Sequence, residues 1–453
     1  MTAVRTRGTG TGRLVLAVLL SGTFVQLTSV TVLQVAIPDV QRDLHAGPAA
    51  AQLVLAGYTL TYACTLITSA RVGDRWGPRR TFAAGMAVFT LATVVAGAAP
   101  GVGVLVAGRL AQGLGSGLMA PQVLTLIQRV VPAERRPRAL GAYGATMALA
   151  SIAGPLLAGA LLQLDPFGLG WRAAVLVTVP VGLVLLLVPA LPPDEPGRDA
   201  RVDPAGAVLS LAGVALLVLP LTVGREAGRP AWSVASLVAA VMLLGAFAAV
   251  QRRVAHPLVP PQVLADAGTR WGIGLVFLFN TGVPSFTLLL SLHSQQAQGV
   301  GPLATAFTVA PYAIGALVGS SVSEHLGRSV LTGSASALVG ASLLVAVTIG
   351  MPEPRWALWL VLAGGGFGFG AFTAAVFTRV LARAEPSAAS ALSGLLPTAQ
   401  QLGGTFSVAL AGSVYYGATG GPGTALWHAM VYEAVVFALA AGAASVLARR
   451  RPG

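Results

Sequence analysis

The chain has 453 residues, of which 55% are hydrophobic and only 9% are charged. Soluble globular proteins carry about 25% charged residues, because a hydrated surface requires them. This composition excludes a soluble protein, and most of the surface must therefore face lipid. The net charge of +13 contains no lysine contribution, since all 28 basic residues are arginine.

In chain order, the predicted elements are long apolar stretches. A helix needs about 20 apolar residues to cross a hydrocarbon core of about 30 Å, and an open strand would leave backbone groups unpaired in lipid. The first stretch is longer than the apolar region of about 7–15 residues in a signal peptide, so we interpret it as an uncleaved span. The fourteen predicted spans cover residues 14–37, 50–70, 81–99, 102–121, 139–163, 172–191, 205–223, 231–250, 271–292, 303–322, 330–349, 356–378, 388–413 and 427–448.

The positions of the arginines predict the orientation. Most of them fall in the connections on one face, for example Arg71, Arg75, Arg79 and Arg80 between the second and third stretches. The positive-inside rule places this face and both termini in the cytoplasm of a multi-pass inner (plasma) membrane protein. The charge is then explained by topology in a lipid bilayer, and no nucleic-acid partner is needed.

A short sequence repeat predicts two related halves. The segment Asp74–Gly77 follows the second stretch and Glu324–Gly327 follows the tenth, with an acid, a basic residue and a glycine in the same register. Parallel halves of this kind, with nested inverted repeats, are typical of one large class of secondary transporters. The predicted domains are a six-helix bundle over residues 1–191, an inserted helix pair over 192–270 and a second six-helix bundle over 271–453.

Three motifs then carry a resemblance to a known family. The segments Gly73–Arg80, Leu105–Gly115 and Ala150–Gly159 resemble the loop, fourth-span and antiporter signatures of the major facilitator superfamily. Trp171-Arg172 and the inserted pair are similar to its fourteen-span drug/proton antiporter branch. The resemblance implies an all-α polytopic protein with the major facilitator fold, two six-helix bundles and an inserted central helix pair.

The loop motif predicts a conformational latch made of Gly73, Asp74, Arg75, Gly77 and Arg79. The Asp74 carboxylate is expected to pair with one of the arginines or to accept from backbone N–H groups at the start of a neighbouring helix. The two glycines allow a tight turn. A plain basic loop that only sets the topology is the alternative.

Arg109 lies inside the fourth predicted span. An intramembrane guanidinium costs a few kcal/mol and tends to face a polar interior, where it can bond backbone carbonyls, Gln112 or a substrate anion. The resemblance implies a role in proton coupling for Arg109, Gln112 and Gly113. Extension of the side chain to the membrane interface is the alternative.

The fifth span contains a predicted kink at Gly154, Pro155 and Gly159. Proline removes one backbone hydrogen bond, and small residues permit close helix contact. The resemblance implies that this segment prevents leakage during exchange, and a packing seam explains the same residues equally well.

The predicted substrate cavity combines polar and aromatic residues at membrane depth, although the aromatic ones are equally suited to lipid or core packing. Its members are Gln26, Ser29, Gln34, Tyr58, Tyr62, Asn280, Phe367 and Gln401.

One departure from the family concerns charge. Antiporters of this branch usually carry an aspartate in the first span, where this chain has Ser29. Glu433 is the clearly embedded carboxylate, so protons use Glu433, His293 or Asp74, or the coupling differs. The missing acid predicts a preference for neutral or anionic substrates over quaternary cations.

The sequence contains no metal-ligand spacing, no nucleophile–base pair and no phosphate-binding loop of the Gly-x-x-x-x-Gly-Lys type. We therefore expect a monomeric transporter without cofactor or metal, not an enzyme, that exports small organic molecules at the expense of the proton gradient. Proton-coupled uptake of a metabolite and a non-transporting receptor or scaffold are the alternatives.

Overall fold

The computed structural model describes residues 9–187, 191, 193–194, 203–222, 231–254, 257, 266–327, 329–348, 355–382 and 386–449, and the secondary structure among them is helical. In these ranges eleven helices are long and apolar enough to cross a membrane, and Trp171–Leu186 and Ala205–Pro220 are shorter apolar helical segments. The predicted all-α polytopic membrane protein is confirmed. The number of fourteen crossings stays a prediction.

The helices fall into three consecutive groups. The first group consists of α1 (Thr9–Asp43), α2 (Pro48–Trp76), α3 (Pro78–Gly97), α4 (Val102–Val130), α5 (Arg136–Leu164), α6 (Trp171–Leu176) and α7 (Val179–Leu187). A hairpin follows, made of α8 (Pro204–Thr222) and α9 (Ala231–Arg253). The last group consists of α10 (Ala267–Asn280), α11 (Val283–Leu292), the π-helix η3 (His293–Ala297), α12 (Pro302–Val322), the 3-10 turn η4 (Ser323–Leu326), α13 (Val330–Thr348), α14 (Arg355–Ala382), α15 (Pro386–Tyr415) and α16 (Pro422–Arg449).

Glycine–proline pairs set where several helices begin. Pro48, Pro78, Pro302 and Pro422 are each the first residue of a helix, and each follows a glycine. Proline suits the first helical position, because its fixed φ is already helical and its missing N–H has no partner there in any case. The connections between spans are therefore encoded locally.

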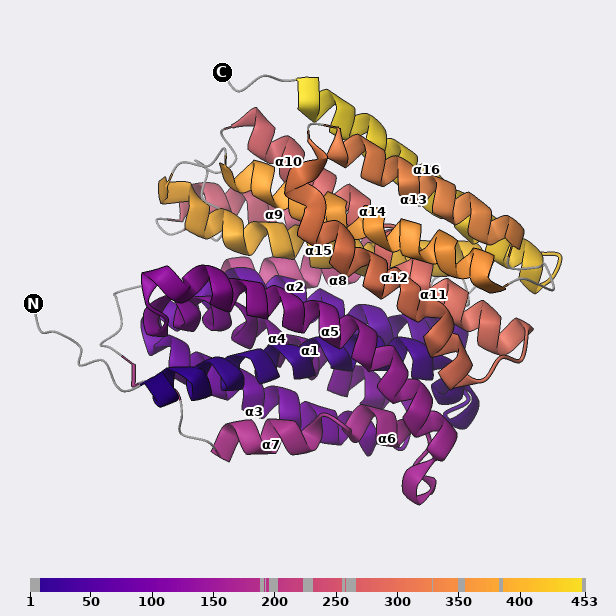
Figure 1. The fold of residues 1–453 in the computed structure, drawn as a ribbon, viewed down its shortest axis with the longest axis horizontal. Coiled ribbons are helices and arrows are strands. Elements are labelled where there is room, and N and C mark those ends of the chain that lie inside the picture. The colour runs from indigo at the N-terminus through magenta and orange to yellow at the C-terminus, as the bar shows by residue number, and fades with distance from the viewer. Residues whose placement is uncertain are drawn as a thin grey trace, which may run out of the picture.

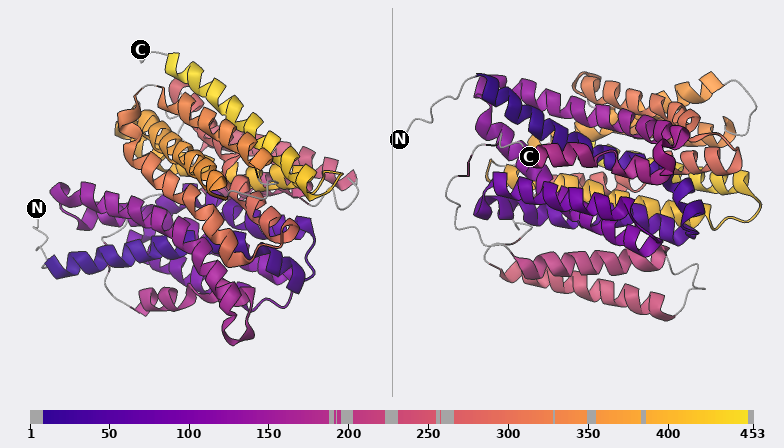
Figure 2. Two further views of the ribbon diagram at one scale, coloured as in Figure 1. Left: turned by 45° about the vertical axis from the view of Figure 1, so that its right-hand side comes forward. Right: turned by 90° about the horizontal axis from the view of Figure 1, so that it is seen from below.

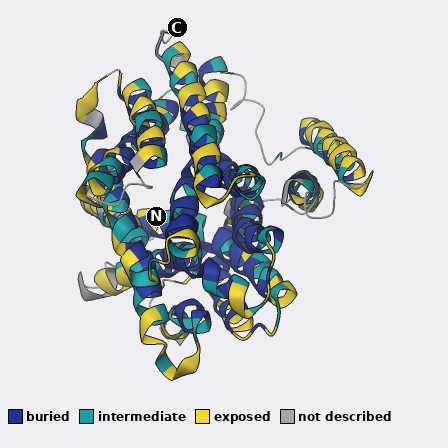
Figure 3. Ribbon diagram, turned by 90° about the vertical axis from the view of Figure 1, so that its right-hand side faces the viewer, coloured by how far each residue is buried: buried dark blue, intermediate teal, exposed yellow. Residues whose placement is uncertain are grey.

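The first and last groups form two bundles that lie side by side (Figure 1). The α8–α9 hairpin stands at one edge (Figure 2), where α8 packs against α2 and α15 in a cluster that includes Leu60, Val214 and Ala409. Much of the hairpin's ribbon is coloured as exposed (Figure 3). On α9 the exposed residues are apolar, such as Met242 with 69% exposure, as expected for a helix that faces lipid. The linkers that flank the hairpin lie largely outside the described residues, and the three-part domain division stays a prediction.

One set of contacts between the two bundles lies at the end opposite both chain termini (Figure 1). Gln295 donates to the carbonyl oxygen of Val35 at 3.0 Å, and Gln296 donates to Gln41 at 2.9 Å. Gly159, near the end of α5, packs directly on the first turn of α12. The bundles are therefore joined where α1 and α5 end and α12 begins, and also between α2 and α15, where Thr405 donates to Thr59 at 2.8 Å.

The internal repeat is visible in the backbone. Gly77 follows α2 with a φ of 94°, and Gly327 follows η4 with a φ of 70°. These left-handed conformations favour glycine, which lacks the Cβ that makes them costly for other residues. Both copies of the repeat therefore use their glycine to turn the chain after a span.

Helices α12 and α14 pack through interlocking glycines. A Cβ added at Gly315, Gly319, Gly366 or Gly370 would overlap a backbone carbonyl group of the other helix. Small residues of this kind let two membrane helices approach closely enough for backbone-to-backbone contact.

We expect Gly366→Ala to destabilise the protein by about 1–3 kcal/mol, because the added methyl group overlaps the carbonyl oxygen of Tyr312 and the helices must separate. The midpoint of thermal unfolding in detergent measures the effect. Gly364→Ala is the matched control, since this glycine is exposed on the same helix and a Cβ there meets no atom within 4 Å. Equal midpoints for the two variants would contradict the packing argument.

Candidate functional site

The Arg109 side chain lies at the centre of the first bundle, on α4, with 2% exposure. Its Nε donates to the carbonyl oxygen of Val54 at 3.2 Å, and its Nη1 donates to Ser29 Oγ at 3.3 Å and Gln112 Oε1 at 2.8 Å. The guanidinium carbon sits 4.4 Å from the centre of the Tyr58 ring, a cation–π arrangement. The predicted bond to Gln112 is present, and the side chain does not extend to the protein surface.

A second layer of hydrogen bonds holds this cluster in place. Gln112 donates to Thr93 Oγ1 at 2.7 Å, and the Tyr58 hydroxyl lies within hydrogen-bonding distance of Ser116 Oγ, at 2.7 Å, and of the carbonyl oxygen of Gln26, at 3.4 Å. These bonds connect α1, α2, α3 and α4. Gly113 lets the helices meet, because a Cβ there would overlap the carbonyl oxygen of Tyr58. The arrangement fixes the guanidinium rigidly at one depth of the bundle.

The Arg109 cluster has no acidic member. Among the described residues, the salt bridges involve Arg42, Arg80 and Arg172, and Arg109 Nη2 is a buried atom without a hydrogen-bond partner. Ser29 occupies the place beside the guanidinium where the antiporter branch usually has an aspartate. The cluster is therefore a buried cationic site, and no acidic side chain of the described residues pairs with its guanidinium. Such a site favours the binding of an anion or of a polar neutral group.

The structure unites only part of the predicted cavity. Gln26, Ser29 and Tyr58 belong to the Arg109 cluster, and Tyr62 stacks obliquely on Tyr58 at 6.0 Å. Gln34 is half-buried further along α1. The other three predicted members, on the second bundle, are Asn280, Phe367 and Gln401, and in the described part of the chain none of them contacts the Arg109 cluster.

The three members on the second bundle have mainly local contacts. Asn280 donates to the carbonyl oxygen of Val276 at 2.8 Å, within its own helix. The backbone of Phe367 packs on α12 at Gly319, and Gln401 is half-buried on α15. Glu433 also lies in the second bundle, fully buried on α16. The predicted coupling residues are therefore divided between the two bundles.

The predicted antiporter kink forms a seam of close contacts. Gly154 lies against Thr31 of α1, and Gly159 lies against Leu303 of α12, so that a Cβ at either position would collide with its neighbour. Pro155 lies inside α5 between them. Gly154 therefore packs within the first bundle and Gly159 packs across to the second, as a packing seam requires, and the role in preventing leakage stays a prediction.

The signature loop has a partner that sequence reasoning missed. Asp194 accepts from the backbone N–H groups of Arg79 at 2.8 Å and Arg80 at 3.1 Å, at the start of α3. Gly77 permits this approach, because a Cβ there would overlap the Asp194 carboxylate. Asp74 is exposed, and the described residues include no ion pair between it and Arg75 or Arg79. The latch through Asp74 stays a prediction, and Asp194 occupies the helix start in this state.

Asp194→Ala should accelerate amide hydrogen exchange at Arg79 and Arg80 about fivefold. Loss of a capping acceptor costs about 1 kcal/mol, which corresponds to about this factor. Mass-spectrometric hydrogen exchange of the peptide that contains these residues measures the effect. Asp74→Ala is the matched control, because it removes a nearby carboxylate that does not cap α3. Equal acceleration in both variants would show that general charge, rather than capping, protects these amides.

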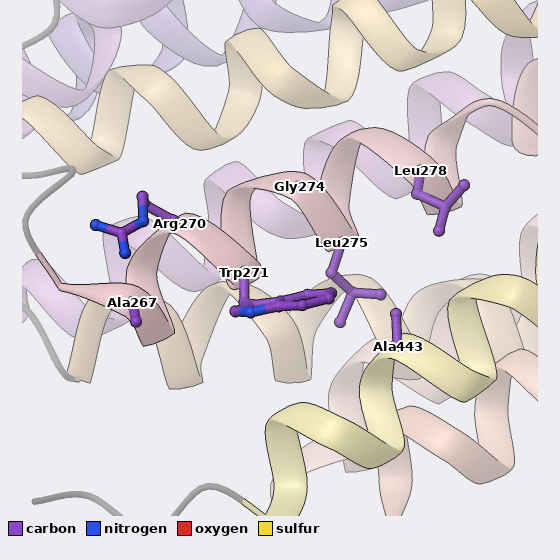
Figure 4. Close-up of a pocket in the computed structure, with 7 residues that line it drawn as sticks. All are labelled: Ala267, Arg270, Trp271, Gly274, Leu275, Leu278 and Ala443. Atoms are coloured by element: carbon purple, nitrogen blue, oxygen red, sulfur yellow. The ribbon is translucent and has the colours of Figure 1, made fainter.

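Two pockets in the described structure lie away from the predicted cavity. One pocket of about 550 Å³ is a groove along α10 that is closed on one side by α16 (Figure 4). A second pocket of about 610 Å³ lies where the bundles meet, between the end of α1 and the loop that precedes α12. The first pocket is lined by Ala267, Arg270, Trp271, Gly274, Leu275, Leu278 and Ala443.

Comparisons with known proteins agree with this architecture. Residues 19–408 match the sequence profile of the Major Facilitator Superfamily. The chain is 34% identical to the probable actinorhodin transporter of Streptomyces coelicolor, over 90% of this chain and 73% of the relative. It is 34% identical to the puromycin resistance protein pur8 of Streptomyces alboniger, over 89% of this chain and 82% of the relative. It is 32% identical to the cephamycin export protein CmcT of Amycolatopsis lactamdurans, over 90% of this chain and 85% of the relative.

Solved structures share the fold at low sequence identity. A bacterial homologue of the human lysosomal transporter Spinster, in an inward-facing and unoccupied conformation, superposes with a TM-score of 0.69 over 98% of both chains at 18% identity. A POT family transporter superposes with a TM-score of 0.69 over 95% of this chain and 96% of that chain at 14% identity. The resemblance found in the sequence motifs is confirmed, and the chain belongs to the drug-efflux branch of the major facilitator superfamily.

Proposed function

We propose that the protein exports small organic molecules from the cytoplasm in exchange for protons. Relatives that are named as export, resistance or transporter proteins share about a third of its residues along most of its length. Family members that move solutes use two bundles that rock about a pathway near the bilayer midplane. The direction of transport rests on these relatives, because importers and exporters pass through the same conformations.

The orientation follows from the arginines and from the contacts between the bundles. We infer that both termini lie in the cytoplasm, so that the joined ends of α1, α5 and α12 face outward and this state is the one that faces the cytoplasm. An exporter loads its substrate in such a state. The eleven long apolar helices, the two shorter ones and α15 give the fourteen crossings that we propose for a monomer in the plasma membrane.

The buried Arg109 cluster is the observation that supports our proposal for the class of substrate. A guanidinium without an acidic neighbour repels cationic substrates and can bind an anionic or hydrogen-bonding one. We therefore propose neutral or anionic molecules, such as aromatic secondary metabolites with acidic or phenolic groups, as substrates.

Transport into everted membrane vesicles tests the proposal. Vesicles from a host that lacks its own efflux pumps would receive an anionic dye, a neutral dye or ethidium, together with an energy source for the proton gradient. We expect accumulation of the anionic and neutral dyes that a protonophore abolishes, and little accumulation of ethidium. Accumulation only in right-side-out vesicles would instead establish uptake, and a preference for ethidium would overturn the substrate class.

A further inference from the structure

The second bundle contains a break in a membrane helix between α10 and α11, at Thr281 and Gly282. Pro284 has no N–H group, so it cannot bond the residue four positions earlier. The N–H of Ser285 bonds Ser407 Oγ of α15 at 3.0 Å, and the carbonyl oxygen of Thr281 accepts from the Tyr432 hydroxyl of α16 at 3.0 Å. In a continuous helix these two backbone groups would bond each other. Side chains from two other helices therefore fill the break.

Glu433 lies directly beside this break. It is fully buried, and its Oε1 accepts a short hydrogen bond from the Ser285 hydroxyl. Its Oε2 has no hydrogen-bond partner, and a Cβ added at Gly282 would lie 2.6 Å from this oxygen. Only glycine at this position leaves the second carboxyl oxygen room beside the broken backbone.

No cation in the described structure faces the Glu433 carboxyl group. The titratable groups near it are the phenols of Tyr312 and Tyr432. Five elements pack against α16. Two of them, α11 and α13, contain no titratable residue. The others contain Arg270 near the start of α10, Tyr415 at the end of α15, and His293 in η3. The His293 side chain lies beside the backbone of Pro422. Pro422 is eleven residues, and about 16 Å along α16, from Glu433.

An ionised Glu433 would be an uncompensated charge in the membrane, which is strongly unfavourable. A protonated Glu433 is neutral and keeps its bond with Ser285. Ionisation therefore requires water to enter or the break to rearrange, and either event changes how α10 and α11 pack against α15 and α16. The geometry links one proton to the shape of the discontinuous helix.

We propose that Glu433, Ser285, Ser407 and the helix break form the proton-binding site through which the gradient drives the transport cycle. The role of this site in transport rests on the proposed function, whereas the binding of a proton at Glu433 does not. A metal cation matches this site less well than a proton does. The Ser407 and Ser285 hydroxyls bond each other at 2.6 Å, and Ser285 in turn bonds the Glu433 carboxyl group. The three groups thus form a chain and do not converge on one point, as the ligands of a metal ion would. Discontinuous helices are common places for coupling ions in secondary transporters.

Infrared difference spectroscopy of the full-length protein in lipid nanodiscs tests the site without any substrate. A pH jump should reveal the carbonyl band of a buried protonated carboxylic acid in the wild type. Glu433→Gln should remove the band, whereas the matched control Glu134→Gln, which changes an exposed acid, should retain it. Ser285→Ala should keep the band but shift its frequency, because the hydroxyl no longer donates to Oε1.

The band must depend on these residues for the proposal to stand. An unchanged band in Glu433→Gln, or a band that responds to sodium at constant pH, would overturn it. If Glu433→Gln does not fold, an unshifted band in Ser285→Ala overturns it equally. Failure of the vesicle experiment would refute export while leaving the infrared result intact, so that the two proposals are tested separately.

Discussion

Substitution of Arg109 by lysine is expected to lower proton-driven dye accumulation on the order of 100-fold. The guanidinium donates to Val54, Ser29 and Gln112 at once, whereas an ammonium group on a shorter stem is a single point charge without the planar fork. Loss of two charge-assisted hydrogen bonds costs about 3 kcal/mol, which corresponds to roughly this factor. Initial rates in everted vesicles, normalised to the amount of protein in the membrane, measure the effect.

Arg129→Lys is the matched control for this substitution. Arg129 lies on the same helix, but its side chain is exposed in the last turn, where an ammonium group replaces a guanidinium at little cost. Its accumulation rate should remain at the wild-type level. A wild-type rate in Arg109→Lys would show that only the charge at this depth matters and that the hydrogen-bonded geometry is dispensable.

Local sequence patterns predicted much of the fold. The long apolar stretches predicted membrane helices, and the described residues contain eleven long apolar helices, because burial in lipid acts on every residue of a span. The bond between Arg109 and Gln112 was also predictable, since residues three apart share one face of a helix. These features depend on spacing within one element, and such spacing is readable without a structure.

Contacts between distant elements were not predictable in this way. The capping of α3 by Asp194 and the pairing of Ser285 with Glu433 join residues that are 115 and 148 positions apart. No periodicity encodes which helices become neighbours. The break between α10 and α11 is indicated in the sequence by Gly282 and Pro284, two residues that weaken a helix. The sequence does not reveal which side chains bond the backbone groups that the break leaves free.

Substitution of Ser29 by aspartate tests the origin of the substrate preference. The Ser29 hydroxyl lies 3.3 Å from Arg109 Nη1, so that a carboxylate there would pair with the guanidinium and neutralise the buried site. We expect the accumulation of an anionic dye, relative to a neutral dye, to fall at least about tenfold, the factor produced by a lost interaction of about 1.4 kcal/mol. Ethidium accumulation should rise, because the repulsion by an unpaired cation is removed.

Ser29→Asn provides the control for this substitution, because its side chain is close in size to aspartate but carries no charge. It should retain the wild-type ratio of anionic to neutral dye, measured from parallel vesicle time courses at one proton gradient. If Ser29→Asn shifts the ratio as far as Ser29→Asp does, the shape of the cavity determines selectivity. If only the aspartate variant shifts it, the unpaired guanidinium determines which charge the protein exports, and the residue beside Arg109 sets the class of substrate.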